Sequence, residues 1–183
     1  MTKERKQFEE HFALTVMDPS SWLEQAQGIR VAASPVLERL LGILHEPQTR
    51  PGVRLQMLAC VRGYMLLTGF AFENVLKAIA VKRGLLRTTS QKLIFDPKLK
   101  REKGGHSLTA FSRDLQLKLT LAERQYLKRL EEYTRWAGRY PVPLNSGEYA
   151  DSHSGGRLSF TTDDPRMGDV LFDKLSDLVE SSA

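Results

Sequence analysis

Hydrophobic residues recur at steps of three and four along most of the chain, which is the period of a helix that buries one face. The longest such stretch runs without a proline from residue 53 to about 83 and predicts one central helix that ends at Gly84. At 1.5 Å per residue this helix would be on the order of 45 Å long. Gly63 and Gly69 lie inside it, so each either weakens the helix locally or marks a close approach of another backbone.

Flanking segments predict further helices. The sequence Asp18-Pro19-Ser20-Ser21 favours a helix start, and Pro35 interrupts or restarts the pattern before a short helix over residues 36–44. Three more helices are predicted over residues 106–117, 120–137 and 164–180. Residues 87–105 form a basic connector with an apolar island at 93–95, and residues 142–163 form an ordered loop or short ribbon. The pattern therefore predicts an all-α bundle.

Length and composition favour one domain, with a core over about residues 18–140 completed by the helix at 164–180. Cys60 is the only cysteine, which excludes an internal disulfide and fits a reducing compartment. The charged N-terminal stretch is not followed by an apolar run of the length that a signal peptide or a membrane span requires. We therefore expect a cytoplasmic protein with no membrane role.

The net charge of +5 favours polyanionic partners such as RNA or nucleotides, although ordinary solubilising charge accounts for it equally well. The candidate metal ligands show no ligand spacing, so we expect neither a metal nor a cofactor. These ligands are His11, His45, His106, His153 and Cys60.

Glu73 lies in the central helix among apolar residues on nearly every side. A helix that is apolar most of the way round is buried, so this carboxylate is predicted to need a cationic or hydrogen-bonding partner. The candidate partners are His106, Arg135 and Arg139. The alternative is an exposed Glu73 that pairs with Lys77 one turn on.

His106 follows Gly104 and Gly105 at the start of a predicted helix, for which Ser107 is the candidate N-cap. Two glycines let the chain turn sharply, and a histidine delivered into the bundle could be charged by a nearby carboxylate near neutral pH. The alternative is a structural role, in which hydrogen bonds of His106 fix the direction in which the connector enters the helix.

Arg135 and Arg139 lie one helical turn apart among aromatic residues. A guanidinium group beside an aromatic ring suits phosphate or base contacts, because its planar fork can chelate an oxyanion and stack on a ring. The same two residues would equally suit a buried pair with Glu73.

Three motifs together resemble the HEPN superfamily of small helical domains. They are FENVLKAI at residues 72–79, GHSL at 105–108 and TRWAGRYP at 134–141, and the resemblance covers roughly residues 55–143. It implies an up-and-down bundle of four to six helices with a long central helix, commonly a homodimer. Members act as RNA-cleaving toxins and antiphage defence effectors, or as non-catalytic partners of nucleotidyltransferases.

The ribonuclease branch of that superfamily has an arginine, a polar residue beside it, and a histidine four to six residues further on. Here Arg139 precedes Tyr140, and the next histidine is His153, so that position departs from the pattern. The spacing from Arg101 to His106 does fit, which makes these two the candidate catalytic residues. His106 would be the base or the acid, and Arg101, Arg135 or Arg139 would be the cation.

Three functions follow as expectations. The first is a HEPN-like module of a defence or toxin–antitoxin system that binds nucleic acid or nucleotides, in which Glu73, Lys77, Arg135 and Arg139 are binding residues. The second is a metal-independent endoribonuclease toxin that uses His106. The third is a protein-interaction bundle without a nucleic-acid role. If His106 is not catalytic, Glu73, His106 and Arg139 would instead form a polar triangle that locks three helices in register, and the surface would do the binding.

Overall fold

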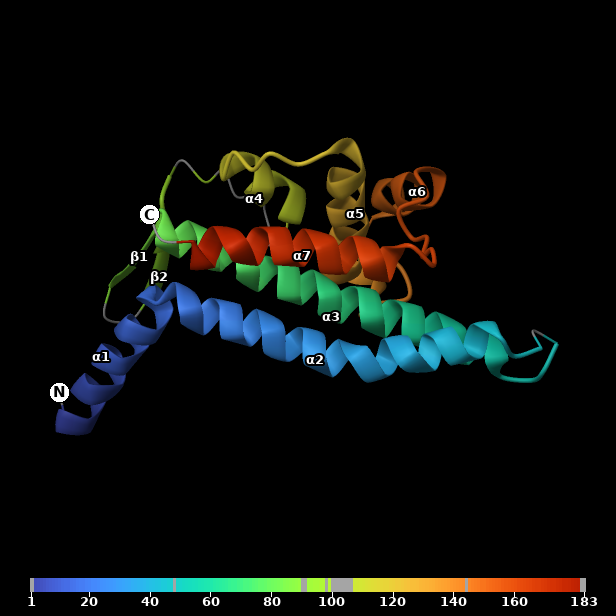
Figure 1. Cartoon of the computed structure of the whole chain (residues 1–183), viewed down its shortest axis with the longest axis horizontal. Helices are drawn as coiled ribbons and strands as arrows, with labels where there is room; N and C mark the ends of the chain where they lie inside the picture. Colours follow the sequence, from blue (N-terminus) through green and yellow to red (C-terminus); the bar gives the residue numbers. More distant parts are fainter. Residues whose placement is uncertain are drawn as a thin grey trace.

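The computed structural model of the chain describes residues 2–47, 49–89, 92–97, 99, 107–143 and 145–181. It is 72% helical, with seven α-helices and one two-stranded sheet among the described residues, so the predicted mainly all-α class is confirmed (Figure 1). In chain order the elements are α1 (Lys3–Met17), α2 (Pro19–Leu44), α3 (Val53–Lys82), β1 (Leu86–Thr89), β2 (Lys92–Phe95), α4 (Leu108–Asp114), α5 (Leu121–Glu132), a π-helical turn η1 (Tyr133–Ala137), α6 (Ser146–Ser154) and α7 (Asp164–Glu180).

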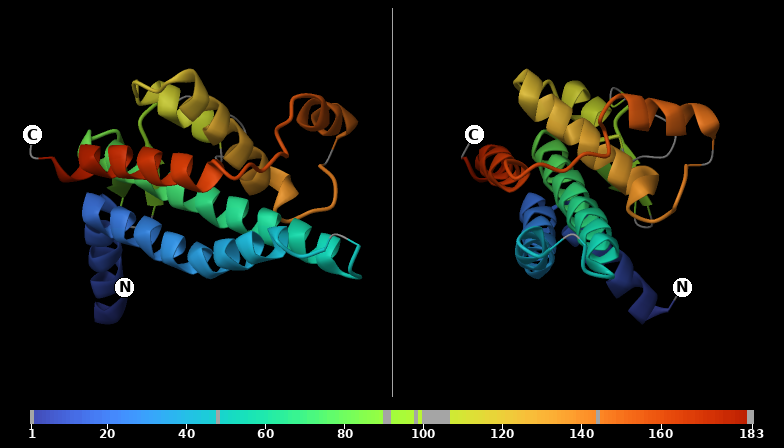
Figure 2. Two further views of the ribbon diagram at one scale, coloured as in Figure 1. Left: turned by 45° about the vertical axis from the view of Figure 1, so that its right-hand side comes forward. Right: turned by 90° about the vertical axis from the view of Figure 1, so that its right-hand side faces the viewer.

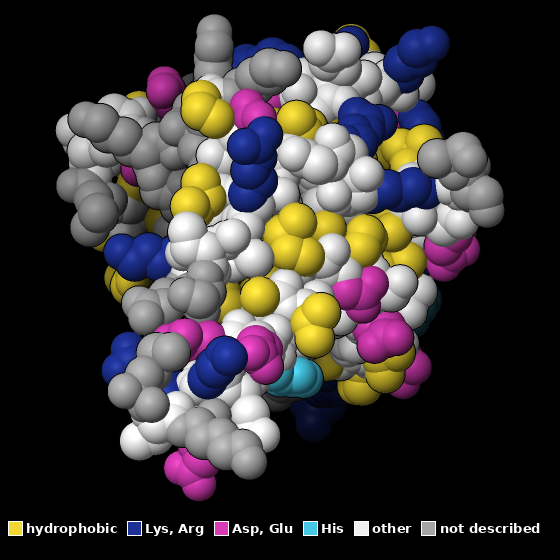
Figure 3. All heavy atoms as spheres, turned by 90° about the vertical axis from the view of Figure 1, so that its left-hand side faces the viewer, with side chains coloured by type: hydrophobic (Ala, Val, Ile, Leu, Met, Phe, Trp, Pro, Cys, Tyr) yellow, Lys and Arg dark blue, Asp and Glu magenta, His cyan; other side chains and the backbone are white. Residues whose placement is uncertain are grey.

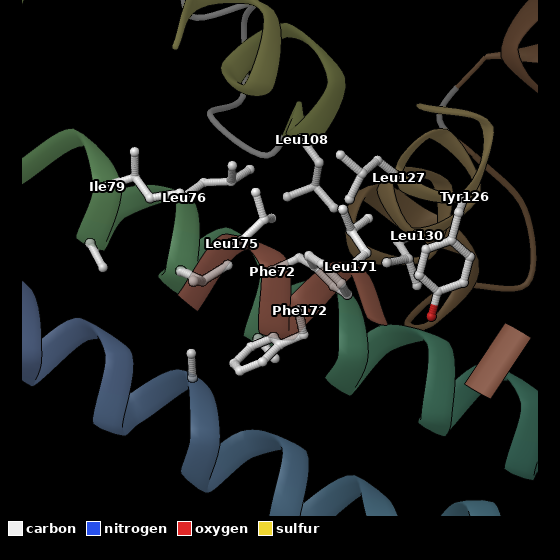
Figure 4. Close-up of a cluster of buried hydrophobic side chains, with 14 of the residues drawn as sticks. Phe72, Leu76, Ile79, Leu108, Tyr126, Leu127, Leu130, Leu171, Phe172 and Leu175 are labelled. Carbon is white, nitrogen blue, oxygen red and sulfur yellow. The ribbon is translucent and has the colours of Figure 1, made fainter. Parts of the chain in front are cut away.

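Helices α2 and α3 form a long antiparallel hairpin, and α7 lies along α3 beside α2 (Figures 1 and 2). Helices α4 and α5 cover another side of α3, while α1 leaves the body at an angle. The core lies where α3 meets α4, α5 and α7 (Figure 4). Its labelled members are Phe72, Leu76 and Ile79 from α3, Leu108 from α4, Tyr126, Leu127 and Leu130 from α5, and Leu171, Phe172 and Leu175 from α7.

Helix α3 is, within the described ranges, the one helix long and apolar enough to span a membrane, and 33% of its most apolar window is buried. Most of its buried residues lie between Tyr64 and Val81, where the other helices cover it. The core helix of a soluble protein has the same length and composition, so this finding is compatible with a soluble protein. The cytoplasmic location stays a prediction.

The predicted break at Pro35 is wrong, because α2 continues through this residue. Proline removes the hydrogen bond that its N–H would give to the carbonyl four residues earlier, at Val31. Both Pro35 and Val31 are exposed, so water can replace that bond.

Four elements, namely two helices and two strands, were not predicted. Helix α1 occupies the charged N-terminal stretch, and α6 lies in the predicted loop, where the Asn145 side chain caps it by accepting from the Glu148 N–H at 2.8 Å. The basic connector contains the antiparallel pair of β1 and β2, with Leu86 opposite Phe95. Helices α1 and α6 have capped starts but no long apolar face, so hydrophobic periodicity does not reveal them.

Gly69 is the point of closest approach between α3 and the α5–η1 segment. A Cβ on this glycine would lie 2.4 Å from Thr134 Cγ2 and 3.2 Å from the backbone oxygen of Leu130. At Gly63 the nearest atom would be Val36 Cγ1, at an ordinary 3.5 Å. The prediction that a glycine marks a close backbone approach is therefore confirmed for Gly69.

Gln116 is the one non-glycine residue with positive φ in the described part of the chain, at 54°. It follows α4, where its N–H donates to the Arg113 carbonyl at 2.8 Å and the Leu117 N–H donates to the Ser112 carbonyl at 3.1 Å. Glycine usually occupies this position of a helix C-terminus, because it has no Cβ to clash in the left-handed region.

We expect Gln116→Gly to raise the free energy of unfolding by about 1 kcal/mol, since it removes left-handed strain. Urea denaturation measures the change. Gln125→Gly is the matched control, because Gln125 is exposed inside α5, where glycine should lower stability by about 1 kcal/mol. A loss of stability in both variants would contradict the prediction.

Candidate functional site

The two residues predicted to be catalytic, His106 and Arg101, lie outside the described residues. The first described residues after them begin α4. Ser107 is the N-cap of this helix, as predicted, and its hydroxyl accepts from the Ala110 N–H at 3.2 Å. The glycine-histidine segment thus leads directly into a capped helix start.

A fully buried carboxylate, Glu131 of α5, lies under the start of α4. Its Oε2 accepts from the Ser107 hydroxyl at 3.1 Å, from the Thr109 N–H at 3.1 Å and from the Thr109 hydroxyl at 2.6 Å. Its Oε1 accepts from Lys128 Nζ at 2.6 Å. Burial raises the pKa of Glu131, but the hydrogen bonds from Lys128 and Thr109 outweigh burial and hold the pKa below its usual value. Glu131 is therefore a charged group that ties α4 to α5.

Glu73 is buried, as predicted, and its Oε1 lies 2.8 Å from Lys77 Nζ. The Lys77 ammonium lies 5.0 Å from the centroid of the Trp22 ring on α2. Burial and the Lys77 pair were predicted as alternatives, yet they occur together. The result is a shielded ion pair within α3, whose lysine also makes a cation–π contact with Trp22 of α2.

Arg135 and Arg139 are both exposed, so the predicted alternative of a buried pair with Glu73 is wrong. Arg135 Nη2 lies 2.6 Å from Glu148 Oε1 of α6. Arg139 Nη2 donates to the Arg135 carbonyl at 2.7 Å, and its guanidinium lies 5.3 Å from the Tyr140 ring centroid. The structure therefore brings Glu73 together with Lys77, and places the two arginines at the surface.

A second buried carboxylate, Glu132, links η1 to α6 and to the segment that follows α6. It accepts from Trp136 Nε1 at 3.2 Å, from the Ser152 hydroxyl at 3.2 Å and from Arg157 Nη1 at 3.3 Å. In the π-helical turn η1, the Trp136 side chain is buried and the Arg135 side chain is exposed. The arginine and the aromatic ring beside it in sequence therefore lie in different environments. Sequence reasoning missed Glu131 and Glu132, because charged residues on a polar helix are usually solvated.

Two further arginines, both on α3, are also exposed. A Cβ on Gly138 would lie 2.8 Å from Leu66 Cβ, so the residues around η1 pack on α3 at Leu66. Arg62 lies one turn before Leu66, and its charge acts on the Tyr133 phenol, whose pKa burial raises to about 12. Arg54 lies two turns before Arg62 and is exposed as well. We call these four residues the arginine surface: Arg54, Arg62, Arg135 and Arg139.

The described residues contain no group of three or more histidine, cysteine, aspartate or glutamate side chains that could hold a metal ion. Comparisons with known protein families, with curated proteins and with solved structures found no match to this chain.

Proposed function

We propose that the chain is a HEPN-like helical module, with its helices in an up-and-down bundle, that binds RNA through the arginine surface. The observation that supports this proposal is the exposure of four arginines on α3 and around η1, beside the exposed Tyr140. The same proposal includes what the resemblance implies about partners and setting: a homodimer, a nucleotidyltransferase-type partner and a defence or toxin–antitoxin system.

The spacing of these groups suits a phosphate backbone. Arg54 and Arg62 are eight residues apart on one helix, which corresponds to about 12 Å along the axis. Guanidinium groups bind phosphate oxygens with two parallel hydrogen bonds, and an exposed tyrosine offers a ring on which a base can stack. Since Glu148 already pairs with Arg135, the positive charge offered to a ligand comes mainly from Arg54, Arg62 and Arg139.

We expect a labelled single-stranded RNA to bind the full chain with an affinity that falls as salt rises. Arg62→Ala and Arg139→Ala should each weaken binding several-fold and reduce the salt slope by about one. Arg5→Ala on α1 is the matched control, since Arg5 is exposed and pairs with Glu9 at 3.3 Å. Fluorescence anisotropy measures all three variants. Affinity that does not change with salt, or variants that behave like the control, would contradict the proposal.

The endoribonuclease remains the alternative, and the buried Glu131 favours it, because this carboxylate anchors the helix start that follows His106. If it holds, the full chain cleaves a structured RNA in EDTA, and His106→Ala and Arg101→Ala each abolish cleavage. Cleavage that survives both substitutions would exclude these residues. No cleavage of any RNA would remove the enzymatic alternative.

An exposed apolar face at the end of the molecule opposite the arginine surface supports the protein-interaction alternative. Figure 3 shows apolar side chains gathered on the face that carries α1 and the β1–β2 hairpin. The exposed large apolar residues of these elements are Phe8, Phe12, Leu14 and Ile94. RNA binding that is absent at low salt would favour this alternative over the first proposal.

A further inference from the structure

A cavity of about 450 Å³ opens between α2, α3 and the first turns of α7. This volume lies in the range of sites that hold small molecules. The cavity has apolar walls, which include Val31, Leu37 and Phe72, and several polar groups converge on it. None of its lining residues belongs to the arginine surface, so it is a separate candidate site.

The floor of the cavity carries hydroxyl groups. Tyr64 and Thr68 line it, and each is only 6% exposed. Burial raises the pKa of the Tyr64 phenol, so this group stays protonated near neutral pH and is a neutral hydrogen-bond donor. The Tyr126 hydroxyl lies behind the wall at Gly168, 2.7 Å from the position that a Cβ on this glycine would take, and it interacts with the Tyr64 hydroxyl.

The charges at the mouth of the cavity compensate each other. Arg30 Nη2 lies 2.5 Å from Asp169 Oδ1, and Arg30 Nη1 lies 3.7 Å from Asp173 Oδ1. The Arg30 guanidinium also lies 4.3 Å from the centroid of the Phe172 ring. An anion would meet the two carboxylates, and a cation would meet the guanidinium, so neither finds an uncompensated counter-charge.

The neutral groups define the ligand instead. The hydroxyls of Ser34, Tyr64 and Thr68 donate and accept, the side-chain amide of Gln27 does both, and the walls favour an apolar body. We propose that this cavity binds an uncharged small molecule with a flat apolar ring system and with hydrogen-bond donors and acceptors. Adenosine has all of these features and is a suitable probe.

Calorimetric titration of the full chain with adenosine tests the site. We expect adenosine to bind, caffeine to bind more weakly because it is flat and uncharged but has no N–H or O–H donor, and adenosine 5′-monophosphate to bind more weakly because its phosphate approaches Asp169. Thr68→Val keeps the side-chain shape without the hydroxyl and should weaken adenosine binding about five- to tenfold. Thr15→Val on the exposed face of α1 is the matched control.

Ser34→Trp is a second variant that does not depend on the packing of the floor, because Ser34 is an exposed residue at the cavity mouth. The indole should block the cavity and abolish adenosine binding, while thermal unfolding checks that the fold is kept. Three results would overturn the proposal: no adenosine binding, equal binding by Thr68→Val and Thr15→Val, or tighter binding of the monophosphate. RNA binding by the arginine surface is measured separately, so the two proposals fail independently.

Discussion

Gly69→Ala is expected to lower the free energy of unfolding by about 1–3 kcal/mol, the usual cost of overpacking a core. The added methyl would lie 2.4 Å from Thr134 Cγ2 and 3.2 Å from the Leu130 carbonyl oxygen. The threonine methyl could move, but the carbonyl belongs to the backbone at the end of α5 and cannot move without shifting that helix. Urea denaturation of the full chain measures the effect.

Gly63→Ala is the matched control in the same helix. Its new methyl meets only Val36 Cγ1 at 3.5 Å, so the higher helix propensity of alanine should raise stability by about 0.5–1 kcal/mol. Thr134→Ser in the Gly69→Ala background removes the clashing methyl and keeps the hydroxyl that donates to the Glu131 carbonyl at 3.0 Å. This double variant should recover part of the loss. Equal stability of the two alanine variants would show that α3 and the α5–η1 segment are not in close contact.

Glu131→Ala is expected to lower the free energy of unfolding by about 2–4 kcal/mol, because it removes a fully buried side chain and the acceptor of partly buried donors, while Lys128 can turn to solvent. It leaves the Thr109 N–H and hydroxyl without their acceptor and separates the start of α4 from α5. Thermal and urea unfolding measure the loss. Glu10→Ala is the control, because Glu10 is exposed on α1 and lies 3.9 Å from Lys6.

The effect of Glu131→Ala should depend on pH. The folded-state pKa of Glu131 lies below the ordinary value of 4.5, so its stabilising contribution is fully present above about pH 4.5. The contribution is lost as pH falls through the lower, folded-state pKa. The stability difference between wild type and Glu131→Ala should therefore shrink in acid. A difference that stays constant between neutral pH and about pH 3 would show that the charge of Glu131 does not contribute.

The residues of the candidate site were predicted to different extents. The burial of Glu73 followed from the apolar residues around it, which is a local property of one helix. The surface position of Arg139 did not follow, because its direction depends on the π-helical turn of η1 and on the packing of Gly138 against Leu66. The local sequence around an arginine beside a buried tryptophan does not show whether the arginine side chain points into the core or toward solvent.

The sequence by itself determined the helices with strong periodicity and clear ends. The predicted ranges 53–83 and 164–180 correspond to α3 at Val53–Lys82 and α7 at Asp164–Glu180, since caps, prolines and apolar spacing act within a few residues. Elements with weak patterns, such as α1 and α6, were not predicted, and local signals misplaced a break at Pro35, where exposure makes the missing hydrogen bond tolerable.

Only the tertiary structure decided that Glu131 and Glu132 are buried. Glu131 and Glu132 are neighbours on one helix, yet each is almost fully shielded, because donors from other segments add to the local ones. These distant donors are Thr109 at the start of α4 for Glu131 and Ser152 on α6 for Glu132. A carboxylate can leave water only where such donors converge on it. These donors lie about 20 residues away in sequence. Their convergence arises from packing and has no local pattern that a reading of the chain could detect.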